Sequence, residues 1–182
     1  MPFSRVYLPV GVSILLVCFA VPAQRKKSRT AGLAKPAAVK INIEPINTDG
    51  LKTLIARQRA KPLLVNFWAT WCVPCREEFP DLVKIDAEFR PRTLDFVTVS
   101  LDDVSDIKTL VPKFLVEMKA TMPAYLLDAK DPEPAINAVD PKWQGDLPAT
   151  FLYNENGEVV FKHFGRVNTA ALREAIEQLA KK

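Results

Sequence analysis

The sequence is poor in the residues that build metal centres and disulfide scaffolds. Its 182 residues include three cysteines and one histidine. A zinc site needs four ligands, and a disulfide-stabilised domain needs several cysteine pairs. Cys18 lies in an apolar N-terminal segment, so only Cys72, Cys75 and His163 remain for the rest of the chain. We therefore expect no metal site, no cofactor and no disulfide scaffold.

Acidic residues are absent from the first 40 positions, and this absence distorts the overall charge. The stretch contains seven of the 25 lysines and arginines, so the remainder holds 18 basic against 21 acidic residues. The net charge of +4 therefore comes from the N-terminal region, and the remainder is mildly acidic. A nucleic-acid-binding domain would need a basic face, so we expect no nucleic-acid partner.

Residues 1–23 have the order of a secretory signal peptide. Arg5 precedes an apolar stretch, and Val-Pro-Ala at 21–23 offers a cleavage site. The alternative is an uncleaved N-terminal anchor, because the apolar length is near the lower limit for a membrane span. The basic run at 25–29 opposes export of the residues C-terminal to it, so both alternatives stay open. A lipid anchor at Cys18 is disfavoured because Val17 is not small.

Beyond this leader the composition indicates one tether and one domain. Residues 24–39 are basic and rich in alanine, serine and proline, which is typical of a flexible tether without a core. Residues 40–182 are long enough for a single domain with a proper core. In either interpretation of the leader, we expect this domain to lie outside the cytoplasm, in the periplasm or anchored facing it. Any membrane contact would be made only by the N-terminal segment.

Periodicity and turn residues in the domain predict alternating strands and helices. Strands are expected at 40–43, 63–68, 94–101, 124–127, 151–153 and 158–164, with a hairpin turn at 154–157 joining the last two. A helix capped by Thr48 or Asp49 is expected through about Gln58. Further helices are expected at 73–89, at 104–119, in a short piece ending at Val139, and at 170–182. The helix 104–119 should be capped by Asp102, Asp103 or Ser105 and kinked at Pro112. This order indicates an α/β fold with a central mixed sheet of about five strands flanked by helices.

The stretch that carries chemistry is residues 71–75, Trp-Cys-Val-Pro-Cys. It follows the apolar strand 63–68 and opens the helix 73–89, so both thiols lie where a buried strand meets a helix N-terminus. The partial positive charge there lowers the pKa of Cys72, and a thiolate is the nucleophile in disulfide exchange. Cys75 lies one turn further in, where it can attack the mixed disulfide that Cys72 forms and release the partner.

Glu78 is the third candidate catalytic residue. It shares a helical stripe with Cys75 and Leu82, on a face that must be buried. Burial would raise its pKa toward the range in which it can take or return the proton of Cys75. The alternative is a solvated acid in the first turns, favoured by the helix dipole. Pro80, in the same helix, predicts a kink.

The run 65–80 resembles the active-site segment of the thioredoxin superfamily, and in particular the TlpA/ResA-like branch of extracytoplasmic thiol-disulfide oxidoreductases. Asn66 stands where thioredoxins carry a buried strand aspartate, and Glu78 matches the glutamate of the CxxCxxE pattern in that branch. The resemblance extends over about residues 40–182. It implies a thioredoxin-like fold, with residues 102–140 as an extra βα-type insertion on the active-site side.

The resemblance also implies a substrate site and a reaction. It places a cis peptide bond at Leu147-Pro148, next to the cysteine pair, where these two residues and Trp71 would contact an extended partner chain. The reaction would be exchange with protein thiols and disulfides outside the cytoplasm, with this protein as the reductant. Members of the branch act on apocytochrome c thiols, among other partners, and an upstream soluble or membrane protein would supply the electrons.

Two other functions compete with this interpretation. The first is a non-catalytic module that uses the cysteine pair to hold copper or a peptide. The second is a peroxidase of related fold, which is disfavoured because peroxiredoxins place threonine where Ala69 stands. Among the flanking residues, we expect Trp68 in the core, Trp71 exposed, Arg76 solvated and His163 at an ordinary edge or surface position.

Overall fold

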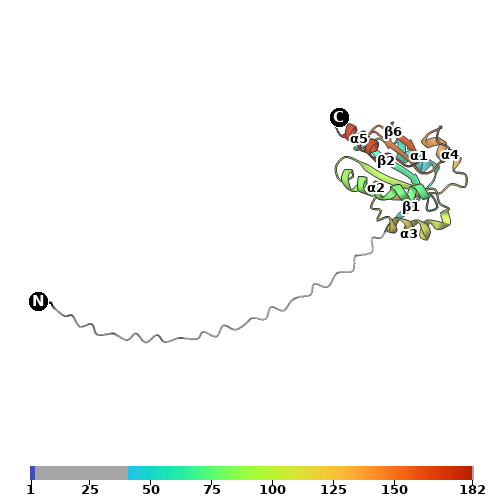
Figure 1. Cartoon of the computed structure of the whole chain (residues 1–182). Helices are drawn as coiled ribbons and strands as arrows, with labels where there is room; N and C mark the ends of the chain where they lie inside the picture. Colours follow the sequence, from blue (N-terminus) through green and yellow to red (C-terminus); the bar gives the residue numbers. More distant parts are fainter. Residues whose placement is uncertain (3–40, 182) are drawn as a thin grey trace. The chain divides into compact units, whose positions relative to one another are not determined.

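The computed structural model describes residues 1–2 and 41–181. The predicted leader and tether, with Cys18, therefore lie outside the described residues apart from the first two positions. Figure 1 shows the arrangement of the elements. The strands are β1 (Ile43–Ile46), β2 (Leu63–Trp68), β3 (Asp95–Ser100), β4 (Ala124–Leu127), β5 (Ala149–Tyr153) and β6 (Val159–Phe164). The helices are α1 (Thr48–Ala56), α2 (Val73–Phe89), the 3-10 helix η1 (Val104–Lys108), α3 (Leu110–Glu117), α4 (Glu133–Val139) and α5 (Thr169–Ala180).

The six strands form one mixed sheet in the order β1-β4-β3-β2-β5-β6. β1, β4, β3 and β2 are parallel, as expected for strands joined by helical crossovers, whereas β5 and β6 are antiparallel to their neighbours. The expected count of about five strands is thus one short. The predicted insertion supplies η1, α3, β4 and α4, and it places β4 between β1 and β3.

Helices cover both faces of this sheet, and each face has its own hydrophobic cluster. α2, α3 and α5 pack on one face through residues such as Phe79, Leu115 and Ile176. α1 and α4 pack on the other face, where they enclose residues such as Phe67 and Phe151. Figure 1 shows α2 and α3 apart from the α1 and α4 pair. The prediction of a central mixed sheet flanked by helices is confirmed.

Residue alternation along the strands places a row of polar side chains under α2. In β2, Leu64 and Trp68 belong to the cluster beneath α2, so Asn66 between them faces the same way. Asn66 pairs in register with Thr98 of β3 and with Thr150 of β5. All three side chains are fully buried. A polar row therefore crosses three strands directly beneath the helix that carries the cysteines.

Several predicted boundaries hold, and two near the N-terminus are wrong. β2, α2 and β4 have the predicted limits, and Gly157 takes a positive φ of 84° in the turn before β6. The first strand is 43–46 instead of 40–43. The α1 cap is Asn47 instead of Thr48 or Asp49, because its Oδ1 accepts from the Gly50 N–H at 2.8 Å, and the helix ends at Ala56 instead of Gln58.

The predicted helix 104–119 is two shorter elements. Thr109, with φ −124° and ψ −87°, separates η1 from α3, so the break precedes the kink predicted at Pro112. Pro112 is the third residue of α3, where a missing N–H leaves no helical hydrogen bond unmade. The cap of η1 is Asp103, which accepts from the Ser105 N–H at 2.8 Å. Among the described residues, no helix combines the length and apolarity that a membrane crossing requires.

Candidate active site

Cys72 and Cys75 form a disulfide at the start of α2, with their Cα atoms 5.3 Å apart. Cys72 is the N-cap of the helix, and its Sγ accepts a hydrogen bond from the Cys75 N–H at 3.2 Å. The side chain of Cys72 is 5% exposed, while Cys75 is fully buried. Once the disulfide is opened, only Cys72 has both surface access and a helix N–H directed at its sulfur.

The first turn of α2 suits a negative charge at Cys72. Pro74 occupies the second helical position, where no backbone N–H is required. The first turn contains no acidic residue to offset the positive end of the helix dipole. These are the features that favour a negative charge at a helix N-terminus.

Glu78 is buried beneath the helix and held by two donors. Its Oε1 accepts from Asn66 Nδ2 at 3.0 Å, and its Oε2 accepts from the Val167 N–H at 2.8 Å. Burial raises the pKa of Glu78, and this effect outweighs the opposing hydrogen bonds and the charge of Arg166. The alternative of a solvated first-turn acid is wrong, because the residue is only 1% exposed.

A second carboxylate anchors the loop before the cysteines. Asp102 Oδ1 accepts from the Thr70 hydroxyl at 2.6 Å, and both carboxylate oxygens lie within 3.1 Å of the Thr70 N–H. Asp102 Oδ2 also accepts from the Ser100 hydroxyl at 2.6 Å. Asp102 thus joins the ends of β2 and β3 next to Trp71. From the sequence, Asp102 was predicted only as a possible helix cap, because the local pattern contains no sign of its partner Thr70, 32 positions away.

Two hollows flank Trp71, whose side chain is 68% exposed. One has a volume of about 280 Å³ and lies against α3, where Lys113 and Glu117 line it. The other, about 290 Å³, is lined by apolar residues of the insertion, such as Leu127 and Ile136, and by Leu147. The insertion therefore does line the side of the molecule that carries Trp71.

Leu147 and Pro148 are joined by a cis peptide bond immediately before β5. The Pro148 carbonyl already accepts from the Gly165 N–H at 2.8 Å. This carbonyl is therefore engaged within the fold, and of the two residues expected to contact a partner chain, Leu147 is the one that borders the hollow beside Trp71.

The other residues considered from the sequence have ordinary positions. Trp68 is fully buried and stacks on Phe114 with ring centroids 4.3 Å apart, as predicted for a core residue. Arg76 is partly exposed and pairs with Glu117 at 2.7 Å. His163 lies half-buried on β6 opposite Thr150. Within residues 1–2 and 41–181, no cluster of histidine, cysteine and acidic residues has the arrangement of a metal site.

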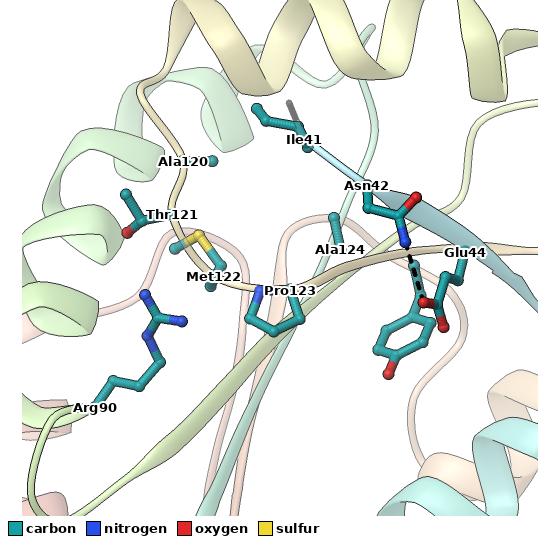
Figure 2. A pocket seen from close by; sticks show the side chains of 10 residues that line it. Ile41, Asn42, Glu44, Arg90, Ala120, Thr121, Met122, Pro123 and Ala124 are labelled. Atoms are coloured by element: carbon teal, nitrogen blue, oxygen red, sulfur yellow. Dashed lines mark hydrogen bonds between the residues drawn. The ribbon is translucent and has the colours of Figure 1, made fainter. Parts of the chain in front are cut away.

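A further hollow of about 280 Å³ lies at the opposite end of the sheet, where β4 begins and α2 ends. Figure 2 shows Arg90 and Thr121 on one side of it and Asn42 and Glu44 on the other. Arg90 and Thr121 both contact the buried Asp86, so both side chains are engaged within the protein. This hollow brings together no candidate catalytic residue.

Comparison with known proteins identifies the family. The sequence model of the AhpC/TSA family matches residues 35–162. The chain belongs to the AhpC/TSA family. The thiol-disulfide oxidoreductase ResA of Bacillus subtilis is 27% identical over 168 residues, which cover 86% of this chain and 83% of that protein.

Solved structures agree with this assignment. StoA of Bacillus subtilis superposes with a TM-score of 0.51 and 26% identity, over 64% of this chain and 83% of that one. A thiol:disulfide interchange protein of the thioredoxin family from Chlorobium tepidum superposes with a TM-score of 0.54 and 24% identity, over 79% and 99% of the two chains, which supports the fold. The predictions of a thioredoxin-like fold and of a protein-disulfide oxidoreductase are confirmed.

Proposed function

We propose that this member of the family exchanges its Cys72–Cys75 dithiol and disulfide with protein partners outside the cytoplasm, and that it acts as their reductant. One observation carries the proposal. Cys72 caps α2 and receives a backbone N–H on its sulfur, while Cys75 is sealed behind it. This asymmetry separates an attacking thiol from a resolving thiol, which a purely structural disulfide does not need.

The first step uses the thiolate of Cys72. It attacks one sulfur of the partner disulfide, so that a bond forms from Cys72 Sγ to that sulfur. The partner's other sulfur leaves as a thiolate and takes up a proton from water. The helix N-terminus stabilises the attacking anion before the step, and the limited exposure of Cys72 confines attack to partners that dock at this surface.

The second step uses Cys75 and Glu78. Cys75 transfers its thiol proton to the carboxylate of Glu78, which lies one turn further along the same buried face. The Cys75 thiolate then attacks Cys72 Sγ, re-forms the Cys72–Cys75 disulfide and releases the partner's second thiolate. Two electrons pass to the partner, and an upstream dithiol protein must return two electrons to this pair.

Trp71, Leu147 and Pro148 form the proposed contact surface for the partner. Trp71 projects between the two hollows, and Leu147 borders the apolar one. An extended partner segment could cross Trp71 with its cysteine above Cys72 and its neighbouring side chains in the hollows. The TlpA/ResA resemblance suggests apocytochrome c as one substrate of this kind. Its two cysteines would form a disulfide after export, and this protein would reduce that disulfide to thiols.

The proposed location depends on residues 1–39, which lie outside the described part of the domain. Their sequence supports either an export signal or an anchor followed by a tether. Labelling of the cysteines in intact cells with a membrane-impermeant thiol reagent, after mild reduction, tests this location. Labelling only after the cells are opened would contradict an extracytoplasmic domain.

Trapping with Cys75→Ser in the native host tests the function. Without its resolving thiol, the variant should accumulate mixed disulfides through Cys72, and mass spectrometry of the linked proteins identifies the partners. Cys72→Ser is the control that should trap nothing. The wild-type dithiol should reduce insulin. Tight copper binding without any exchange would instead favour the non-catalytic module.

A further inference from the structure

The amide of Asn66 is the most unusual polar group near the cysteines. The residue is fully buried, and its Nδ2 donates to Glu78 Oε1 at 3.0 Å and to Thr150 Oγ1 at 3.1 Å. Its Oδ1 has no hydrogen-bond donor among the residues that the structure describes. An unsatisfied buried carbonyl is costly, so a natural protein that keeps one there needs a reason.

The reason lies in the two protonation states of Glu78. When the carboxyl is ionised it only accepts, and the present orientation of Asn66 gives it a donor. When the carboxyl is neutral it has one O–H to donate. Glu78 Oε2 accepts from the Val167 N–H, and the carbonyl oxygen of a neutral carboxyl is its better acceptor, so this contact favours the proton on Oε1, where it faces Asn66.

A half-turn of the Asn66 amide satisfies this second state. The amide is planar and its oxygen and nitrogen are nearly equal in size, so the half-turn places Oδ1 where Nδ2 now lies. Oδ1 would then accept from the O–H of Glu78 and from the hydroxyl of Thr150, which can donate as well as accept. Nδ2 would move to the place where Oδ1 now has no partner, so each orientation leaves one end of the amide unpaired. Each orientation therefore matches one charge state of Glu78 with the same three side chains, at the same cost of one unpaired amide group.

We propose that Asn66 is a positioning residue for Glu78, and that its side-chain amide turns over each time Glu78 gains or loses a proton during the exchange cycle. This proposal rests on the proton-carrying role of Glu78 in the proposed function. It explains why an amide stands at position 66, since an aliphatic side chain would serve neither state. An ionised aspartate would serve only the neutral one.

Few charged groups lie near Glu78, so a change in its carboxyl signal with pH can be assigned to its own titration. Arg166, in the segment before α5, is the charge that acts on it, and Arg166 itself pairs with Glu77 at 3.3 Å. Cys72 and Cys75 share its helix but do not titrate while they form a disulfide. The test is therefore made on the full-length protein in its oxidised form, in which Glu78 is the group at this site that gains or loses a proton.

Nuclear magnetic resonance tests the turnover directly. The Glu78 carboxyl carbon is titrated in labelled oxidised protein, together with the Asn66 side-chain amide protons. Above the pKa of Glu78, these protons should show contacts to the Thr150 methyl group, and the contacts should weaken below that pKa with the same midpoint. Contacts that stay constant through the titration of Glu78 would overturn the proposal.

The pKa of Glu78 in two variants supplies a second test. Asn66→Leu removes the donor to the ionised carboxyl, which forms the stronger hydrogen bond, and should raise the pKa of Glu78 by about one unit, a tenfold change in its proton affinity. Tyr153→Phe removes another buried polar group without a partner, on the opposite face of the sheet, and should leave that pKa unchanged. An unchanged pKa in Asn66→Leu would contradict the proposal.

The two proposals can fail separately. A wild-type protein that reduces no disulfide would overturn the proposed function, while the titration of the oxidised protein would still report whether the amide turns. If Asn66→Leu does not fold, the wild-type titration alone decides. Conversely, an amide that does not turn leaves the roles of Cys72 and Cys75 unaffected.

Discussion

The two faces of the sheet are packed by different kinds of residue. On the face covered by α1 and α4, the buried strand residues that the structure describes are apolar, among them Val65, Val99 and Phe151, apart from the hydroxyl of Tyr153. On the face covered by α2, the polar row of Asn66, Thr98 and Thr150 interrupts the apolar cluster. The same three strands therefore supply an apolar support on one side and a polar site on the other.

This difference shows where the fold accepts a cost in stability. Buried polar groups destabilise unless they are paired, and the face under α2 includes buried atoms without partners, such as Asn66 Oδ1 and Thr98 Oγ1. The opposite face has little such burden. We infer that the apolar face stabilises the domain while the other face holds the groups that respond to the cysteines.

The largest expected effect is a loss of stability on the apolar face. Phe151→Ala should lower the free energy of unfolding by about 3–5 kcal/mol, because it leaves a cavity beside Phe67 and Trp143. The rate at which the folded protein reduces a disulfide should hardly change. Denaturant unfolding and an insulin assay measure the two quantities, and a parallel loss of both would contradict the division between faces.

Substitution of Glu78, on the face under α2, should slow the reaction and leave the fold intact. Glu78→Gln removes the proton acceptor and should slow the release of the partner by about 100-fold near neutral pH, a magnitude typical of general acid–base catalysis. Its folded structure should persist. Stopped-flow measurement of mixed-disulfide decay tests this prediction, and an unchanged decay rate would remove Glu78 from the mechanism.

The same variant should also change how stability depends on pH. Burial raises the pKa of Glu78 above its ordinary value of 4.5, so the folded state keeps a proton that the unfolded chain loses. Wild-type stability should therefore fall as pH rises from about 4.5 through the folded pKa, by about 1.4 kcal/mol for each pH unit that separates the folded and unfolded pKa values. Glu78→Gln should lack this fall, and a wild-type protein that instead gains stability relative to the variant over this pH range would contradict the sign.

A smaller effect is expected at the loop before the cysteines. Thr70→Val removes the hydroxyl bonded to Asp102 but keeps the backbone N–H, and should cost about 1 kcal/mol of stability. Thr70→Ser keeps the hydroxyl and is the matched control. Thermal unfolding of both variants measures the difference, and equal stability would show that the hydroxyl contributes nothing.

The smallest effect is expected at the single histidine. His163→Gln should leave the exchange rate within about twofold of wild type, because the side chain lies on β6 and belongs to no catalytic constellation. Insulin reduction by the variant and the wild type, measured side by side near neutral pH, tests this. A rate that falls well beyond twofold in the variant would place His163 in the mechanism.

Much of this arrangement could be predicted from the sequence because the informative signals are local. The apolar run of β2 and the stripe of Cys75, Glu78 and Leu82 locate the thiols at a helix start and bury the carboxyl. The break at Thr109 was missed because the pattern around Pro112 is apolar on both sides and does not distinguish one helix from two.

The partners of the site residues could not be predicted in this way. Val167 lies 89 positions from Glu78 and contributes only a backbone N–H, which leaves no trace in residue identity. The pairing of Asn66 with Thr150 depends on the register of two strands 84 positions apart. Such contacts depend on how distant segments meet in the sheet, and a local pattern contains no information about them.

The Asp102 carboxylate has a consequence for how relatives could be recombined. It is the first residue of the insertion, yet it binds the backbone and hydroxyl of Thr70, two positions before Cys72. A chimera that receives the insertion of another protein must therefore retain an acceptor at position 102. Without one, the grafted segment could bring a new docking surface and at the same time release the loop that aims the reactive sulfur at its target.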